Sequence, residues 1–136
     1  MKWFVLSLLA FTPHAFALGP IPNGTYEGKL SCRSSRDAMP ESQETIVVGD
    51  DSMDYSSAEG KFQERFVATD GRNFRVNPEK ENGSGYFTDD GLFFRIAIGG
   101  FTGEDRYRFL DNKLYLLGSV VVGKDMYLCS AIFERK

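Results

Sequence analysis

The sequence predicts an all-β protein, an antiparallel up-and-down barrel of about ten strands (eight to ten), and three observations support this fold class. Apolar and polar residues alternate along most of the chain, β-branched and aromatic residues are frequent, and turn-forming residues recur about every 8 to 12 positions. No long stretch has the apolar spacing of an amphipathic helix. A two-sheet sandwich built from the same strands is the alternative arrangement.

The N-terminal residues have the features of a secretory signal peptide. Lys2 precedes an apolar stretch that begins at Trp3, and Ala15-Phe16-Ala17 provides a small-residue cleavage site. We therefore expect residues 1–17 to be removed and residues 18–136 to form one exported domain, in a periplasm or outside the cell. No second apolar segment approaches the roughly 20 residues of a membrane-spanning helix, so no membrane span is expected.

Cleavage at this point would narrow the chemistry available to the mature chain. It would remove the only histidine, His14, and with it any Ser-His or Cys-His nucleophile pair and any histidine-ligated metal site. The full chain has a net charge of −3 and no basic stripe, so nucleic acid is not an expected partner. We expect a monomer with no metal, no cofactor and no catalytic residue.

Ten strands are expected, each an alternating or β-rich run bounded by turn residues. They cover residues 24–32, 43–49, 52–57, 62–69, 72–77, 84–88, 91–98, 104–110, 113–122 and 125–134.

The connections between these strands alternate in length. The second, fourth, sixth and eighth are short and rich in Asp, Asn and Gly, which adopt tight-turn conformations; they cover residues 49–51, 70–71, 89–91 and 111–112. The first, third, fifth and seventh are longer and cover residues 33–42, 57–61, 77–83 and 99–103. Alternate connections of a meander lie at opposite ends, so one end is expected to be closed by tight turns and the other to open between loops.

The turn lengths predict a consistent inward face. Residues opposite each other in a hairpin share a face of the sheet. The expected turns bring apolar or small residues together on that face: Val120 with Tyr127, Gly118 with Cys129, Leu116 with Ala131, Tyr107 with Leu116, Phe109 with Leu114, Ile46 with Tyr55, and Phe66 with Val76. At 89–91 we expect a three-residue turn with a glycine bulge, which pairs Thr88 with Leu92 and Tyr86 with Phe94.

Two cysteines remain after cleavage, and their positions suggest how the sheet closes. An even number of cysteines in an exported chain favours a disulfide between Cys32 and Cys129 over two free thiols. Placing these residues opposite each other pairs the first strand with the last and sets Tyr26 opposite Arg135. This register would close the barrel and remove two exposed strand edges.

The segment that opens the first strand, Gly24-Thr25-Tyr26-Glu27-Gly28, resembles the calycin superfamily, which contains the lipocalins and their ten-stranded fatty-acid-binding relatives. In that superfamily a Gly-x-Trp near the closed end packs under an arginine, and a long first loop lies over the open end. The matching residues are Gly24, Tyr26 and Arg135, with tyrosine in place of tryptophan, and the helical lid of the fatty-acid-binding group is missing. The resemblance implies the barrel architecture.

One inward position suggests a binding site. Glu64 lies between Phe62 and Phe66 near the loop end, where its carboxylate is either hydrated at the mouth or anchors a polar or cationic group of a ligand. The inward aromatic residues either fill the barrel or leave a cavity. The other expected ligand-binding residues at this mouth are Tyr55, Phe101, Tyr127, Arg33 and Arg36.

Three classes of function remain open. The expected one is a non-enzymatic, exported barrel that binds a small, largely apolar molecule. The alternative is an inhibitor or adaptor that binds another protein, such as a lysozyme or a protease, through the long first loop, residues 33–42. An enzyme would use a carboxylate pair that includes Glu64, but no spacing singles out its partner.

Overall fold

Ten antiparallel strands close into a barrel in which each strand pairs with its neighbours in the sequence and the first pairs with the last. The computed structural model describes residues 18–80 and 82–136, so the expected signal peptide, residues 1–17, lies outside the described residues. The strands are β1 (Gly24–Arg33), β2 (Ser42–Val48), β3 (Ser52–Ser57), β4 (Gly60–Ala68), β5 (Asn73–Val76), β6 (Asn82–Phe87), β7 (Gly91–Ile98), β8 (Phe101–Leu110), β9 (Lys113–Val122) and β10 (Asp125–Arg135). Among the described residues there is no helix of the length and apolarity needed to cross a membrane.

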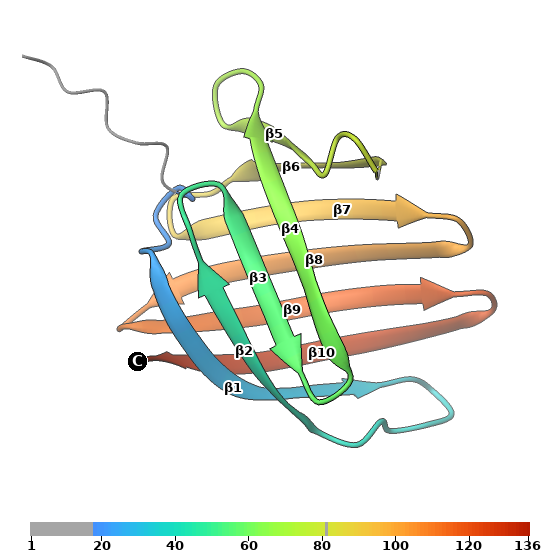
Figure 1. The fold of residues 1–136 in the computed structure, drawn as a ribbon. Coiled ribbons are helices and arrows are strands. Elements are labelled where there is room, and N and C mark those ends of the chain that lie inside the picture. Colours follow the sequence, from blue (N-terminus) through green and yellow to red (C-terminus); the bar gives the residue numbers. More distant parts are fainter. Residues whose placement is uncertain (1–17, 81) are drawn as a thin grey trace, which may run out of the picture.

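The barrel is flattened into two layers that share β1. Figure 1 shows β2, β3 and β4 crossing in front of β8, β9 and β10 at a steep angle, while β1 curves from one group to the other. The connections after even-numbered strands lie at one end of the barrel, and those after odd-numbered strands lie at the other. The core lies between the layers.

The predicted closing register is the observed one. β1 pairs with β10 so that Tyr26 is opposite Arg135 and Cys32 is opposite Cys129. A disulfide joins Cys32 to Cys129, which are 97 positions apart in the sequence. The predicted pairings at the β2–β3, β4–β5, β8–β9 and β9–β10 hairpins are also confirmed.

The start of β1 is held against the end of β10 by a buried tyrosine and an arginine. The Tyr26 side chain is fully buried, and its hydroxyl donates a hydrogen bond to the Pro22 carbonyl at 2.7 Å. The Arg135 guanidinium donates to the Asn23 carbonyl at 2.7 Å and crosses Gly24 so closely that a Cβ atom there would lie 3.0 Å from its Nε. Glycine at position 24 therefore makes room for the arginine.

The segment before β1 plugs the tight-turn end of the barrel, which the sequence analysis did not predict. Leu18 and Ile21 are fully buried and belong to the hydrophobic core. Gly19, with φ 55°, lies against the ring of Phe87, where a Cβ atom would approach within 2.6 Å. A segment this short has no periodicity, so nothing in its pattern reveals that two of its side chains face inward.

The turn between β6 and β7 differs from the prediction. The pairing is Phe87 with Leu92 and Gly85 with Phe94, so the expected pairs Thr88–Leu92 and Tyr86–Phe94 are wrong by one residue. A two-residue turn is closed by a hydrogen bond of 2.9 Å from the Thr88 amide to the Gly91 carbonyl. Glycine at position 85 suits the observed register, because a Cβ atom there would lie only 2.7 Å from Cβ of Phe94.

Two of the connections expected to be long are short. Ser57 pairs with Gly60, and Ile98 pairs with Phe101, so the predicted loops 57–61 and 99–103 are two-residue turns. Gly99 adopts φ 55° and allows the second of these turns. The open end is therefore framed mainly by the segment 34–41 and the segment that follows β5.

We expect the double variant Cys32→Ala/Cys129→Ala to fold with a free energy of unfolding lower by roughly 4 kcal/mol, because the disulfide closes a loop of almost the whole barrel in the unfolded chain. Urea unfolding, followed by far-ultraviolet circular dichroism, measures this change in the free energy of unfolding. A reducing agent should destabilise the wild type and leave the double variant unchanged. Equal stability of wild type and variant would contradict a stabilising role for the bond.

A cavity with acidic residues in the open half of the barrel

The interior is filled at one end and hollow at the other. Large side chains that are fully buried occupy the tight-turn half: Phe66, Phe74, Phe133, Met53, Leu92 and Leu114. In the other half a cavity of about 490 Å³ opens between β1, β2, β3, β4, β7, β8, β9 and β10. This volume lies within the range of small-molecule sites. Both outcomes left open by the sequence, a filled core and a cavity, therefore occur in the same barrel.

The cavity walls are mostly apolar, and two aromatic side chains stand at its rim. Leu30, Phe94 and Ile96 contribute to the walls. At the rim Phe62 is 60% exposed and Phe101 is 40% exposed. Phe62 stacks on Tyr55 with ring centroids 4.5 Å apart and an interplanar angle of 7°. Exposed aromatic rings at an entrance offer apolar surface to an incoming ligand.

A buried chain of hydrogen bonds crosses the cavity floor. The hydroxyl of Tyr55 donates to Oε2 of Glu64 at 2.8 Å, and the Tyr107 hydroxyl lies 3.0 Å from the Tyr55 hydroxyl. Since Tyr55 has one hydroxyl proton and a carboxylate only accepts, Tyr107 is the donor in the second bond. Glu64 is only 7% exposed. The chain thus provides a polar partner for a carboxylate that burial alone would make costly.

Burial and nearby negative charges both raise the pKa values of Tyr55 and Tyr107. Burial raises the pKa of Tyr55 well above its ordinary value, and the charge of Glu64 raises it further. Burial also raises the pKa of Tyr107, with a further contribution from the charge of Asp105. Both phenols therefore remain protonated and act as hydrogen-bond donors across the physiological pH range.

Asp105 on β8 is a second acidic residue of the cavity, and the sequence analysis missed it. It lies opposite Gly118 on β9, where a Cβ atom would overlap Oδ1 of Asp105. Because Gly118 has no side chain, the Asp105 carboxylate has room to pack against β9. Burial, and secondarily the charge of Glu44, raise the pKa of Asp105 to about 7. The sequence does contain the information that places Asp105 inward. The predicted register of the 111–112 hairpin sets Asp105 opposite Gly118, on the same face as Tyr107.

Glu44 on β2 is the third acidic residue that lines the cavity. Its Oε1 accepts a hydrogen bond of 3.2 Å from the Ser42 hydroxyl. Burial raises its pKa, the Ser42 hydrogen bond opposes that shift, and the nearby charge of Glu59 adds to it. No lysine, arginine or histidine belongs to the cavity lining formed by the described residues. The cavity is therefore an apolar space with an acidic character.

The acidic residues of the described chain do not form a recognisable metal centre. Within residues 18–80 and 82–136 there is no group of three or more His, Cys, Asp or Glu side chains arranged to hold a metal ion. The cavity acids are spread over β2, β4 and β8 and face a shared space.

The structure brings together some of the predicted site residues. Glu64, Tyr55 and Phe101 line the cavity. Tyr127 is partly buried but lies outside the lining. Arg33 and Arg36 are exposed at the long first loop, where Arg36 lies 4.0 Å from Asp125. Among the lining residues that were not predicted as part of the site are Glu44, Phe62, Asp105 and Tyr107.

Comparisons with known proteins identify the architecture. No protein-family model matches the sequence, and no curated protein matches it at a significant level. Among solved structures the S-type phycobiliprotein lyase CPES from Guillardia theta is similar, with a TM-score of 0.66 and 12% sequence identity over 84% of this chain and 88% of that chain. The fold is a calycin-like barrel. At this level of identity the likeness concerns the fold alone.

The same comparison overturns the expectation from the sequence that the protein is not an enzyme, because a protein with this fold is named a lyase and the fold therefore does not imply a non-enzymatic role. A carboxyl group with a pKa of about 7, such as that of Asp105, is suited to both giving and accepting a proton at neutral pH.

We expect Asp105→Asn to remove a loss of stability that the wild type shows as the pH rises. The unfolded Asp105 ionises near its ordinary pKa, whereas the folded one stays protonated up to about 7, so its stabilising effect is present below pH 4 and disappears by pH 7. The difference in the free energy of unfolding amounts to roughly 4 kcal/mol, at about 1.4 kcal/mol per pKa unit for a shift from 3.8 to about 7. Urea unfolding between pH 4 and pH 8 measures it.

Glu104→Gln is the matched control for this experiment. Glu104 is the preceding residue on β8, but it forms an ion pair with Arg95 on the outer surface. Its substitution should leave the pH dependence between pH 4 and pH 7 close to that of the wild type. An Asp105→Asn variant with the same pH dependence as the wild type would show that the carboxyl group is not held in a buried, acid-lined place.

Proposed function

We propose that this protein is an exported calycin-like barrel that binds a small, largely apolar molecule with a cationic or hydrogen-bond-donating group. The observation that carries this proposal is the composition of the cavity, which combines apolar walls with Glu44, Glu64 and Asp105 and has no basic residue in the lining formed by the described residues. A cation or a donor group is the natural complement of such a site.

The electrostatics of the cavity support a cationic ligand. The pKa values of Glu44 and Asp105 are raised, in both cases first by burial and then by a neighbouring acid. Placing a positive charge among these groups would favour their ionised forms and replace repulsion with attraction. The apolar part of the ligand would gain about 25 cal/mol for each Å² of surface that it buries against the walls and the aromatic rim.

Two features support export: the N-terminal segment that precedes the barrel, and the disulfide between the first and last strands. Residues 1–17 have the composition of a signal peptide, and the disulfide between Cys32 and Cys129 is a bond that persists in oxidising compartments. The proposal therefore assigns the mature protein to a periplasm or to the extracellular space.

A second candidate is acid–base chemistry on the molecule held in the cavity. Asp105 favours it, because its pKa of about 7 allows proton transfer in either direction at neutral pH. The similar fold of a protein named a lyase is compatible with such a role. The test is to recover the bound molecule after incubation with wild type or with Asp105→Asn. A chemical change that requires Asp105 would support catalysis, and an unchanged molecule would support binding alone.

We expect the fluorescent apolar dye N-phenyl-1-naphthylamine to enter the cavity, and dodecylammonium to displace it better than dodecanol does at pH 8. The reason is the attraction between the ammonium group and the ionised acids. Glu64→Gln and Asp105→Asn should each weaken displacement by dodecylammonium about tenfold, equivalent to about 1.4 kcal/mol. Between pH 6 and pH 8 the wild type should bind dodecylammonium more tightly as Asp105 ionises, and Asp105→Asn should lose this trend.

Glu104→Gln, with its outward-facing side chain, again serves as the control and should behave as the wild type does. Absence of dye uptake by the folded protein would count against an internal binding site. Equal displacement by dodecylammonium and dodecanol at pH 8 would leave an apolar site but overturn the preference for a cation.

Native mass spectrometry of the protein purified from its source organism separates the remaining classes. A retained small molecule with a basic group is the expected result, together with a chain that begins at Leu18 if the expected cleavage takes place. Co-purification of a stoichiometric protein, released when the loop 33–42 is shortened, would favour the inhibitor or adaptor alternative instead.

A further inference from the structure

A second concavity lies on the outer surface of the same barrel, across β8, β9, β10 and β1. It is a hollow of about 1240 Å³, and its lining shares only Leu116 with the internal cavity. Neighbouring residues on these strands point to opposite faces of the sheet, so the side chains that face the hollow are not those that face the cavity. The hollow is therefore a separate candidate site.

The centre of the hollow is apolar and exposed. Leu117 on β9 is 65% exposed and Ile132 on β10 is 54% exposed. Tyr115 lies directly opposite Ile132 in the β9–β10 pairing. Large aliphatic side chains clustered on an outer sheet surface lose the benefit of burial unless something covers them.

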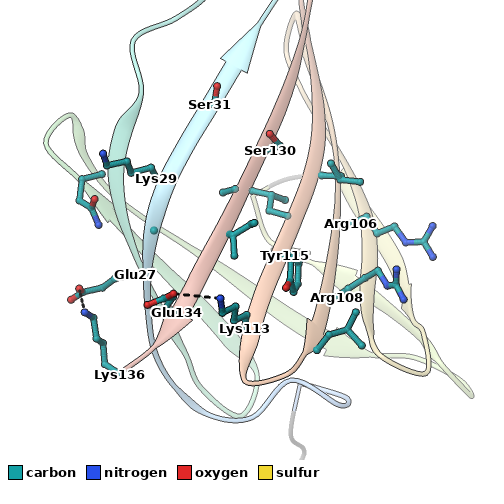
Figure 2. A pocket seen from close by; sticks show the side chains of 17 residues that line it. Glu27, Lys29, Ser31, Arg106, Arg108, Lys113, Tyr115, Ser130, Glu134 and Lys136 are labelled. Carbon is teal, nitrogen blue, oxygen red and sulfur yellow. Dashed lines mark ion pairs between the residues drawn. The ribbon is translucent and has the colours of Figure 1, made fainter.

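The acidic side chains in this hollow are already neutralised. Glu27 forms an ion pair of 3.0 Å with Lys136, and Glu134 forms one of 3.5 Å with Lys113. Figure 2 shows both pairs at one end of the hollow. Neither acid is left to repel an anion that approaches the apolar centre.

The cations that remain flank the apolar centre. Within the described residues, neither Lys29 nor Arg106 takes part in an ion pair among the seven that occur. Figure 2 shows Lys29 on one side of the hollow and Arg106 with Arg108 on the other, with Tyr115 between them. Arg108 is held by Asp90 at 2.6 Å, which leaves Arg106 as the guanidinium available on that side.

The pattern of charge and shape selects one class of occupant. A second copy of this chain placed symmetrically on the face would bring its own Lys29 and Arg106 against the same positive surface. A flat membrane surface does not fill a concave site. A single molecule with an apolar chain and an acidic headgroup matches the aliphatic centre and the free guanidinium at the same time.

We propose that the hollow formed by the outer faces of β1, β8, β9 and β10 binds an amphiphile with an anionic headgroup. The alkyl chain lies across Leu117, Tyr115 and Ile132, and the headgroup pairs with Arg106. The four strands span roughly 14 Å, since adjacent strands are about 4.8 Å apart, which is the scale of a medium-length alkyl chain. The barrel would then hold ligands of opposite charge on the two faces of one sheet.

Titration with sodium dodecanoate below its micellar concentration tests this proposal. Calorimetry should detect binding, and amide resonances of Tyr115, Leu117 and Ile132 should shift in heteronuclear NMR spectra. Arg106→Gln and Leu117→Ser should each weaken binding about tenfold. Both side chains are exposed, so the fold should be retained, and circular dichroism checks this.

Matched substitutions elsewhere on the outer surface provide the controls. Arg75→Gln on β5 and Val47→Ser on β2 alter exposed residues outside the hollow and should leave the affinity for dodecanoate unchanged. Dodecylammonium should bind to the internal cavity and cause no shifts at Leu117. The weakened internal binding of Asp105→Asn should not be accompanied by weaker dodecanoate binding, so the two proposals fail independently.

Four results would overturn the outer site. They are unchanged affinity in Arg106→Gln and Leu117→Ser, shifts confined to residues of the internal cavity, equal binding of dodecanoate and dodecanol at the hollow, and binding only to phosphatidylglycerol vesicles with none to the monomeric amphiphile. The last result would assign the face to a membrane surface instead.

Discussion

The pairing of β1 with β10 is the constraint on which the rest of the molecule depends. Side chains alternate with a period of two, so a slip of one residue at this seam would move the inward set of β1 to the outer surface. The disulfide and the packing of Arg135 over Gly24 hold the seam at its two ends. Closure also leaves no free strand edge among the ten strands. The inward position of Tyr26 and the outward position of Lys29 follow from this register.

The division of the interior explains how a barrel of this size is both stable and hollow. The tight-turn half is filled by large apolar side chains and by Leu18 and Ile21 from the segment before β1. That packed half allows the other half to remain open and to hold acidic groups. The hydrogen bond from Tyr55 satisfies Glu64, whereas burial raises the pKa of Asp105 and opposes its ionisation. Such perturbed groups are characteristic of functional sites.

The two faces of the sheet formed by β8, β9 and β10 carry different charges. The reason is that successive side chains of a strand point to opposite faces. Asp105 faces the cavity, and the next residue, Arg106, faces the outer hollow. Leu116 and Leu117 divide in the same way between the core and the exposed apolar centre. A single layer of strands can therefore have acidic side chains on its inner face and basic and apolar side chains on its outer face. The outer face can change without disturbing the cavity as long as the register is kept.

The sequence by itself determined the ten strands, most hairpin registers, the disulfide and the inward position of Glu64, because these follow from period-two alternation, turn chemistry and the pairing of the two cysteines that follow the expected signal peptide. Only the tertiary structure decided how deep each inward residue lies and what meets it across the barrel. The Tyr107–Tyr55–Glu64 chain joins strands far apart in the sequence, and the burial that sets the pKa of Asp105 is a property of the closed sheet. Local pattern specifies which face a side chain takes, whereas contact across the interior depends on the twist and closure of all ten strands, which no local pattern contains.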